Sequence, residues 1–314
     1  MATQYRKGLY DLGDGIFAYL QPDGSWGWSN AGLIVDGEET LLVDTLFDLK
    51  LTQEMLDEMR AAVPQAEAIG TLVNTHANGD HCWGNELVEG AEIIASRSSA
   101  EEMEEVPASL LEGMMQAAPN MGELGDYLTR IFGPFDFSGI RTTLPSRTFE
   151  RELNLKVGDK AVELIEVGPA HTRGDVLVHV PADRTVFTGD ILFVEGHPII
   201  WAGPVENWIR ACERIMAMDV ETVVPGHGPL TDKAGVAAVR DYLAYVAAET
   251  RKRYDAGMPA FEAAQDIAMD DYDSWGDGER IAVNVSTLYR EFSGDTSPVD
   301  IVALFGQMAQ LAKR

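Results

Sequence analysis

The chain has 314 residues, 46% of them hydrophobic and 24% charged, so it is long enough to bury a substantial globular core. Acidic residues outnumber basic residues by 51 to 24, which gives a formal net charge of −27. A surface of this charge repels polyanions, so we expect neither a nucleic-acid partner nor an anionic membrane partner.

The sequence predicts a cytoplasmic protein. The stretch from Met1 to Tyr19 lacks the basic-then-apolar order of a signal peptide, and no apolar run approaches the ~20 residues that span a bilayer. Cys82 and Cys212 are too few for a disulfide framework, which favours a reducing compartment.

The first third of the chain alternates short apolar runs with turns. The apolar runs on either side of Asp36–Gly37 predict a hairpin, and a helix is predicted where Leu51, Met55, Leu56 and Met59 recur at helical spacing. We expect strands at 15–20, 31–35, 40–44, 68–74 and 93–95, and a helix at 49–62.

The rest of the chain combines a helical insertion, further strands and a helical tail. From about residue 98 to 133 the pattern is helical, but Pro107 and Pro119 break it into short pieces. After Asp232 the pattern stays helical. We expect strands at 148–155, 162–167, 176–180, 185–188 and 222–224, and a helix at 205–218.

Histidines and aspartates directly follow several of the predicted strands. The densest cluster is the loop from His76 to His81, and further candidates are His171, Asp190 and His227. Strand ends hold loop side chains rigidly, which a metal site requires. Because imidazole and carboxylate together are typical ligands of Zn²⁺, and also of Mn and Fe ions, these residues indicate a metal site.

In this order the motifs resemble the metallo-β-lactamase superfamily, whose signature is H-x-H-x-D-H followed by a distant His, a bridging Asp and a final His. The resemblance extends from about Gly15 to Asp232. It implies an α/β fold, the αββα metallo-β-lactamase sandwich, with a helical insertion and a C-terminal helical extension. The catalytic domain would span 1–245, with the insertion at about 98–133, and the extension would span 246–314.

A weaker resemblance concerns one branch of this superfamily, the aromatic polyketide cyclase and thioesterase-like proteins. It rests on the stretches 29–32 and 167–172 and on the helical tail near 279–291. The tail could also provide the surface of a homodimer.

The family pattern implies ligands for two metal ions, with one departure. The expected ligands are His76 and His171 for the first site, Asp80, His81 and His227 for the second, and Asp190 as a bridge. Asn78 stands where the family has the second His of H-x-H, so the first site lacks a usual ligand. An amide oxygen is a poorer ligand for Zn²⁺ than imidazole is. Three states stay open: one ion in the second site, two ions with Asn78 or water completing the first, or no ion.

The resemblance implies a metal-dependent hydrolase that acts on an ester, thioester, lactone or amide bond of a small-molecule substrate. Metal-bound hydroxide would attack the carbonyl carbon, and Asp80 would orient it as the catalytic residue. Two alternatives stay open. The metal could stabilise an enolate in a polyketide cyclase-like or lyase reaction, or the chain could be a non-catalytic ligand-binding protein with a relic site.

Other residues are candidates for supporting roles. Asp44 and Asp175 are expected to hold imidazoles in the correct tautomer. Candidates for the substrate pocket are His197, Trp26, Trp28 and Arg173, each with an ordinary structural role as the alternative.

Overall fold

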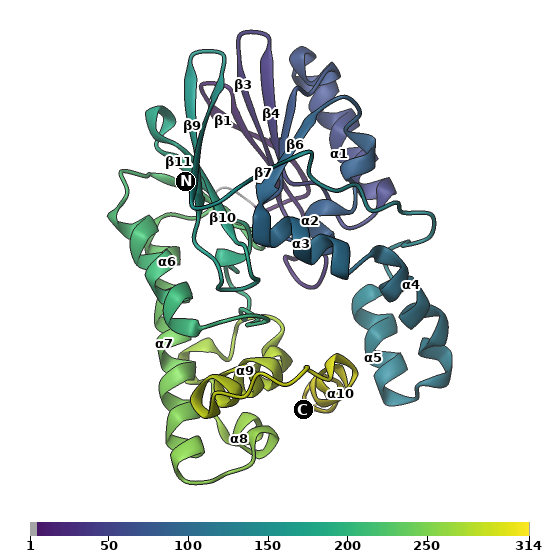
Figure 1. Cartoon of the computed structure of the whole chain (residues 1–314), viewed down its shortest axis with the longest axis vertical. Helices are drawn as coiled ribbons and strands as arrows, with labels where there is room; N and C mark the ends of the chain where they lie inside the picture. Colours follow the sequence, from purple (N-terminus) through teal and green to yellow (C-terminus); the bar gives the residue numbers. More distant parts are fainter. Residues whose placement is uncertain (1–4, 314) are drawn as a thin grey trace.

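Two β-sheets lie face to face at the centre of the molecule, and helices cover their outer faces (Figure 1). The computed structural model describes residues 5–313. Residues 1–4, which open the stretch from Met1 to Tyr19, and residue 314 lie outside the described residues. The α/β sandwich with a C-terminal helical extension, predicted from the sequence, is confirmed.

The first sheet follows the order of the chain. Its first four strands form an antiparallel meander, and β4 to β7 run parallel to one another. The strands are β1 (Gly8–Gly13), β2 (Ile16–Leu20), β3 (Ala31–Asp36), β4 (Glu39–Val43), β5 (Thr71–Val73), β6 (Glu92–Ser96) and β7 (Arg147–Phe149).

The second sheet has the order β12-β11-β10-β9-β8. Its neighbours pair antiparallel except β11 and β12, which are parallel. The strands are β8 (Glu152–Val157), β9 (Lys160–Glu166), β10 (Val176–Val180), β11 (Thr185–Phe187) and β12 (Thr222–Val224). The loops that follow β4, β5, β11 and β12 carry Asp44, His76, Asp190 and His227.

Helices pack on both outer faces and extend the sandwich at one end (Figure 1). α1 covers the first sheet and α6 and α7 cover the second, while α3 to α5 form the insertion. The helices are α1 (Leu49–Ala62), α2 (Gly79–Cys82), α3 (Arg97–Glu105), α4 (Ala108–Ala117), α5 (Glu123–Phe132), α6 (Val205–Ala217), α7 (Lys233–Asp255), α8 (Ala260–Asp266), α9 (Ile281–Ser293) and α10 (Ile301–Leu311).

Alternate residues of the strands fill two separate cores, as the pleat of a strand requires. In β4, Leu41 and Val43 belong to the core between the sheets, whereas Leu42 belongs to the core under the helices. A Cβ atom at Gly32 of β3 would lie 2.1 Å from the Phe187 ring of the opposite sheet. Glycine at this position therefore lets the two sheets pack closely.

The structure differs from the sequence prediction in two strands. β1 was not predicted, because the segment GLYDLG has two glycines and no sustained alternation of apolar and polar residues. The stretch 148–155, predicted as one strand, is divided between β7 of the first sheet and β8 of the second. The chain turns between them at Arg151, whose φ is 66°. The predicted single strand is therefore wrong.

The predicted boundary between residues 245 and 246 falls inside α7. This helix runs unbroken from Lys233 to Asp255, and Val239, Leu243 and Val246 are buried along it. The division of the chain at this point stays a prediction, and no break in α7 marks it.

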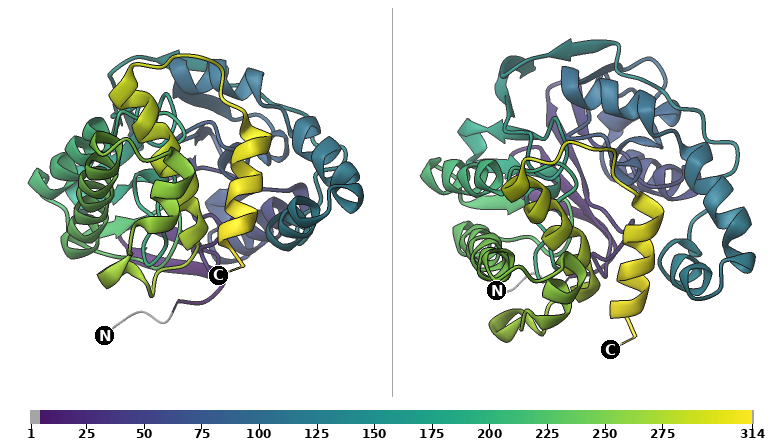
Figure 2. Two further views of the ribbon diagram at one scale, coloured as in Figure 1. Left: turned by 90° about the horizontal axis from the view of Figure 1, so that it is seen from below. Right: turned by 60° about the horizontal axis from the view of Figure 1, so that its bottom comes forward.

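The insertion and the extension meet at the same end of the sandwich. α10 packs against both α5 and α9, and Figure 2 shows it (yellow) between the insertion and the other helices of the extension. Phe305 of α10 lies 6.0 Å from the ring of Phe132 in α5 and 5.8 Å from the ring of Trp26, between ring centroids. The Tyr127 hydroxyl of α5 donates a hydrogen bond to Glu279, at 3.0 Å. The insertion and the extension, the two appendages of the sandwich, therefore form one continuous wall.

Within residues 5–313, none of the helices combines the length and the apolar character that crossing a bilayer requires.

We expect Phe305→Ala to lower the free energy of unfolding by about 3 kcal/mol, because it leaves a cavity in this aromatic cluster. Amide hydrogen exchange of α10 should also become faster. Ile301→Ala, at a 40% exposed position of the same helix, is the matched control and should change neither quantity appreciably. Unchanged exchange of α10 in Phe305→Ala would show that Phe305 does not anchor the helix.

Candidate metal centre

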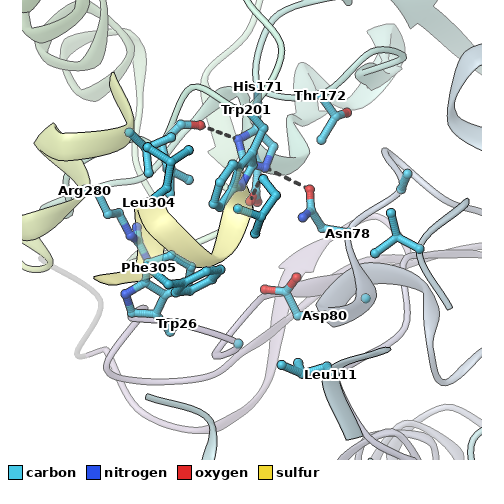
Figure 3. A pocket seen from close by; sticks show the side chains of 18 of the residues that line it. Trp26, Asn78, Asp80, Leu111, His171, Thr172, Trp201, Arg280, Leu304 and Phe305 are labelled. Carbon is cyan, nitrogen blue, oxygen red and sulfur yellow. Dashed lines mark hydrogen bonds and ion pairs between the residues drawn. The ribbon is translucent and has the colours of Figure 1, made fainter. Parts of the chain in front are cut away.

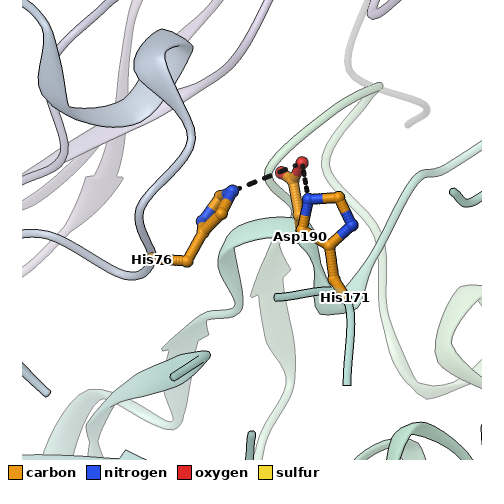
Figure 4. A group of neighbouring side chains, drawn as sticks. All are labelled: His76, His171 and Asp190. Carbon is orange, nitrogen blue, oxygen red and sulfur yellow. Dashed lines mark ion pairs between the residues drawn. The ribbon is translucent and has the colours of Figure 1, made fainter. Parts of the chain in front are cut away.

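The candidate metal ligands converge at the edge where strands of both sheets end. They fall into two groups, within each of which the ligand atoms lie within 4.8 Å of one another. The first group is His76, His171 and Asp190, drawn in Figure 4, and the second is Asp80, His81 and His227. The structure thus brings together all the ligands predicted from the sequence.

The Asp190 carboxylate lies between the two groups. Its Oδ2 atom is 3.6 Å from His76 Nε2, 3.3 Å from His171 Nε2 and 3.4 Å from His227 Nε2. Its Oδ1 atom is 3.0 Å from His81 Nε2. One carboxylate therefore faces four imidazoles, which is the arrangement that a bridging ligand needs.

Asp80 belongs to the second group and also faces open space. Its Oδ2 atom lies 3.2 Å from His227 Nε2 and 3.9 Å from His81 Nε2. Its side chain is 13% exposed, against 4% for that of Asp190. Asp80 is therefore the more accessible of the two carboxylates.

The buried charges shift the pKa values of the ligands in opposite directions. Burial disfavours a charged imidazole, but the Asp190 and Asp80 carboxylates outweigh it and raise the pKa of His227 to about 9. For His171 burial is the largest effect, and it lowers the pKa of the ring to about 3. Burial alone would raise the pKa of Asp190, but the nearby imidazoles of His227 and His81 hold it well below its ordinary value. Without a cation, the ionised Asp190 carboxylate is thus balanced by protonated imidazoles, and a bound metal ion would displace those protons and take over their charge.

Unsatisfied buried atoms provide a test of whether these residues fit a metal ion. His76 Nε2, His81 Nε2 and Asp190 Oδ1 are buried without a hydrogen-bond partner. The His81 and Asp190 atoms lie 3.0 Å apart but lack the alignment of a hydrogen bond. Such atoms typically cost about 1–3 kcal/mol each, and a divalent cation would satisfy them. The nitrogen and oxygen donors fit Zn²⁺ well.

Asp44 holds two of the imidazoles in the orientation that a metal ligand needs. Its Oδ2 atom accepts hydrogen bonds from His81 Nδ1, at 2.9 Å, and from the Thr75 hydroxyl, at 2.7 Å. Thr75 Oγ1 in turn lies 3.0 Å from His76 Nδ1 and accepts a hydrogen bond from its N–H group. In their neutral forms, which a metal ligand requires, both rings carry the proton on Nδ1 and turn the lone pair of Nε2 toward the site. Asp44 contacts His81 directly and His76 through Thr75.

Asp175 has a different role from the one expected. Its carboxylate accepts hydrogen bonds from the backbone N–H and the hydroxyl of Thr172, at 3.0 and 2.8 Å, and not from an imidazole. Burial raises the pKa of Asp175 to about 7. The expectation that Asp175 holds an imidazole is therefore wrong, because the carboxylate closes the turn that follows His171.

Asn78 lies beside a ligand atom of the first group. Its Oδ1 atom is 3.1 Å from His171 Nε2, as Figure 3 shows. His171 Nδ1 donates to the Ile199 carbonyl at 2.7 Å, so a neutral ring presents a lone pair at Nε2. The amide of Asn78, turned to offer its NH₂ group, would pair with this lone pair and compete with a cation there. We therefore expect the first group to hold a cation less tightly than the second.

Two polar residues of the stretch 29–32 hold the loops of the second group. The Ser29 hydroxyl donates to the Asp80 carbonyl at 2.5 Å. Asn30 Nδ2 donates to the carbonyls of Pro225 and Gly228, on either side of His227, at 3.0 and 2.9 Å. Neither residue is among those predicted for the site, although the stretch itself carries the weaker resemblance.

The helical extension supports His171 through backbone groups. Asn284 of α9 is fully buried, accepts from the Ile200 N–H and donates to the Pro198 carbonyl, both at 2.8 Å. It thereby holds the Ile199 carbonyl against His171. The sequence offers no signal for this contact, because any residue type can supply a backbone carbonyl.

A cavity of about 590 Å³ opens above the ligands (Figure 3). Its floor is formed by Asn78, Asp80, His171, Asp190 and His227. Its wall is largely apolar and includes Trp26, as expected from the sequence.

Arg280 was not predicted for the site, although it lines this wall. Its guanidinium lies 4.5 Å from the centroid of the Trp26 ring and 5.1 Å from that of Phe193. It pairs with Asp277 at 3.0 Å.

The other residues predicted for the substrate pocket do not line this cavity. Trp28 packs on the ring of Phe135 at 4.8 Å. Arg173 pairs with Glu105 at 2.7 Å and with Glu102 at 3.6 Å. The ring of His197 is buried, and its nitrogens lie 3.0 Å from the Tyr242 hydroxyl and 3.1 Å from the Tyr272 carbonyl. These contacts explain why the three residues are packing or surface residues and not pocket residues.

A comparison with protein families agrees with this geometry. The family described as the metallo-beta-lactamase superfamily matches residues 24–227, which is more than half of the chain. The chain belongs to this superfamily. The match includes every candidate ligand of both groups.

Among curated proteins, the chain is similar to the hydroxyacylglutathione hydrolase of Maricaulis maris (strain MCS10), with 24% identity over 200 residues. That alignment covers 62% of this chain and 59% of that protein. It is also similar to the 2,4-dinitroanisole O-demethylase subunit alpha of Nocardioides sp. (strain JS1661), with 21% identity over 239 residues, 72% of this chain and 57% of that protein. The chain spans between 45% and 59% of the length of the curated relatives it matches.

Solved structures share the fold at low sequence identity. A stereoselective inverting sec-alkylsulfatase from Pseudomonas sp. superposes with a TM-score of 0.67 at 15% identity, covering 93% of this chain and 52% of that one. A metallo-beta-lactamase from Pontibacter korlensis gives a TM-score of 0.57 at 19% identity, covering 76% of this chain and 99% of that one. The likeness to the sulfatase extends through the helical extension.

We expect the wild-type protein to retain about one zinc ion per chain and Asn78→His to retain about two, because an added imidazole strengthens the first group. Elemental analysis of the variant and the wild type, purified side by side, measures this. Asn78→Ala, which removes the amide without adding a ligand, is the control and should stay closer to one ion than to two. About two ions in all three proteins would show that the first group is complete without an imidazole at position 78.

We expect Asp44→Asn to weaken zinc binding by about 10–100-fold, because the amide no longer holds the His81 ring as a carboxylate does. Competition with a chromophoric chelator measures the affinity. Asp48→Asn is the matched control: Asp48 is also buried, and its Oδ1 atom accepts from the Leu51 N–H, which an amide can replace. Equal affinities of the two variants would contradict the role of Asp44.

Proposed function

We propose that this protein is a metal-dependent hydrolase that cleaves an ester, thioester, lactone or amide bond of a small molecule. The observation that carries this proposal is the position of the candidate ligands: four of the six, Asp80, His171, Asp190 and His227, form the floor of a cavity large enough for a substrate. Fold alone would not support an activity, because one fold serves many reactions. The combination of both ligand groups with a cavity of about 590 Å³ does.

The residues of the floor have distinct tasks in this reaction. Zn²⁺ held by the two groups would supply Lewis acidity and a water of pKa near ~7. The Asp80 carboxylate, which is ionised and faces the cavity, accepts a hydrogen bond from the attacking water and orients it. Asp80 Oδ1 or Oδ2 then carries the proton to the leaving group.

The apolar wall excludes competing water from the reacting bond. Trp83 and Phe47 stack at 5.2 Å between ring centroids, and both line the cavity close to Ala77 and Asp80. With bulk water excluded, the charges of the floor act on the substrate in a medium of lower dielectric constant.

The name of one relative supports a reaction with water, and the names differ in the bond concerned. One relative is a hydrolase of hydroxyacylglutathione and another is an O-demethylase. An acyl bond fits the floor best, because the Asp80 carboxylate that would orient a water lies beside ligands for a cation that would stabilise a tetrahedral oxyanion. A cyclase-like or lyase reaction is the alternative that an experiment must separate.

We expect the zinc-loaded protein to hydrolyse at least one acyl ester, thioester or lactone and to incorporate one oxygen from H₂¹⁸O into the acid product. Asp80→Asn should lower kcat/KM by about 10²–10⁴-fold, because the general base is lost. Asp219→Asn, which changes an exposed carboxylate paired with Arg184, is the control and should keep the wild-type rate.

Mass spectrometry of the product decides between the functions. Turnover without solvent oxygen in the product would favour the cyclase-like or lyase reaction. No turnover of any such substrate by the loaded protein, and no effect of Asp80→Asn on ligand binding, would favour a binding protein with a relic site.

A further inference from the structure

Most of the exposed large hydrophobic side chains gather at the mouth of the cavity. Among the described residues 5–313, these exposed side chains are Val106, Leu110, Leu144, Val299, Ile301 and Val302. All of them except Leu144 line the cavity above the candidate metal centre. We call Val106, Leu110, Val299, Ile301 and Val302 the apolar rim. Their exposed fractions lie between 40% and 58%. Contact of this much neighbouring apolar surface with water is unfavourable and typically marks a binding site.

The rim is built by both appendages of the sandwich. Val106 and Leu110 come from the insertion, at the end of α3 and in α4. The extension contributes Val299, two residues before α10, and Ile301 and Val302, at the start of α10. Because α10 also packs against α5, the two parts of the rim belong to one continuous wall.

The wall is largely apolar from the rim down to the ligands. Leu111 and Met114 of α4 continue it inward on one side, and Leu304 and Phe305 of α10 on the other. Trp83 then closes it beside the floor. Figure 3 shows Leu304, Phe305 and Leu111 around the space above Asp80 and Asn78. The cavity thus has a polar, ionised end and an apolar end that opens to solvent.

The charged side chains of the wall are already paired within the protein. Glu102 lies 3.6 Å from Arg173, and the guanidinium of Arg280 lies 3.0 Å from Asp277. Arg290 lies 2.9 Å from Asp295. A substrate with many polar or charged groups along its length would have to break these pairs or leave its own groups unsatisfied.

We propose that the natural substrate is an amphiphile, in which the bond to be cleaved lies on the metal-binding floor and a long apolar chain runs outward between α4 and α10. The apolar rim covers the far part of this chain. The reacting end of the substrate rests on the hydrolytic function proposed above. We call the space between α4 and α10 the apolar channel. It is a separate binding element, and its binding of an apolar chain can be tested without catalysis.

Binding of neutral 1-alkanols, from butanol to decanol, tests the channel directly. The protein is used with its metal, below the concentrations at which the alcohols aggregate. Binding is followed by the fluorescence of Trp26, Trp83 and Trp201, which all line the cavity. Each added methylene that is buried should lower Kd about fourfold, so affinity should rise steeply along the series.

The double variant Leu110→Ser, Val302→Ser tests the rim. Both positions are at least half exposed, at 58% and 50%, so the substitutions leave the core packing unchanged. We expect Kd for decanol to rise about tenfold or more and Kd for butanol to stay unchanged. Leu144→Ser is the matched control: it removes an exposed leucine outside the cavity and should leave the whole series unchanged.

Three results would overturn the proposal. The first is a Kd that does not depend on chain length, and the second is an equal effect of Leu144→Ser and the double variant. The third is a sedimentation experiment in which the double variant turns a dimer into a monomer while the chain-length dependence stays the same, because the rim would then be a dimer surface.

The hydrolytic function and the amphiphile proposal fail separately. Chain-length-dependent binding without hydrolysis of any ester from acetate to decanoate would leave the channel standing and contradict the hydrolase. Hydrolysis with the same kcat/KM for all of these esters would support the hydrolase and contradict the channel.

Discussion

Asp190 lies within 3.6 Å of imidazole nitrogens from four histidines, and all five side chains are almost completely buried. Burying so many ionisable groups together is unfavourable unless charge and hydrogen-bonding capacity are balanced within the cluster. The loops around the cluster serve this requirement. Asp44 fixes the orientation of the rings that follow β5, and Gly226 leaves room for Asp190, since a Cβ atom there would lie 2.0 Å from Asp190 Oδ1.

The helical extension is coupled to this cluster, although its residues are not among the candidate ligands. Asn284 holds the 198–200 segment, whose Ile199 carbonyl fixes the ring of His171. Phe305 of the same extension closes the wall of the cavity against the insertion. One appendage therefore orients a candidate ligand and also shapes the cavity, which links the candidate metal centre to the cavity wall.

The candidate ligands were predictable because histidine is scarce, with 6 in the chain, and the spacing of histidines and aspartates after strands carries information in a single sequence. Asp44 was predictable for the same reason, whereas Asp175 contacts Thr172 and was misassigned. His197 looked equally suitable as a loop histidine, but its burial against Tyr242 depends on distant segments meeting. The contact of Ile199 with His171 uses a backbone carbonyl, which has no signature in the sequence. Periodicity likewise located α1 but could not show that 148–155 crosses between two sheets.

The central claim is that the buried cluster is a cation site whose second group is the stronger one. Anomalous diffraction at the zinc edge, from crystals grown with Zn²⁺, tests it most directly. We expect a strong peak about 2.0–2.2 Å from Nε2 of His81 and His227 and from an Asp80 oxygen, and a weaker peak or none beside His76 and His171. A strong peak only at the first group, or no peak at either group, would contradict it.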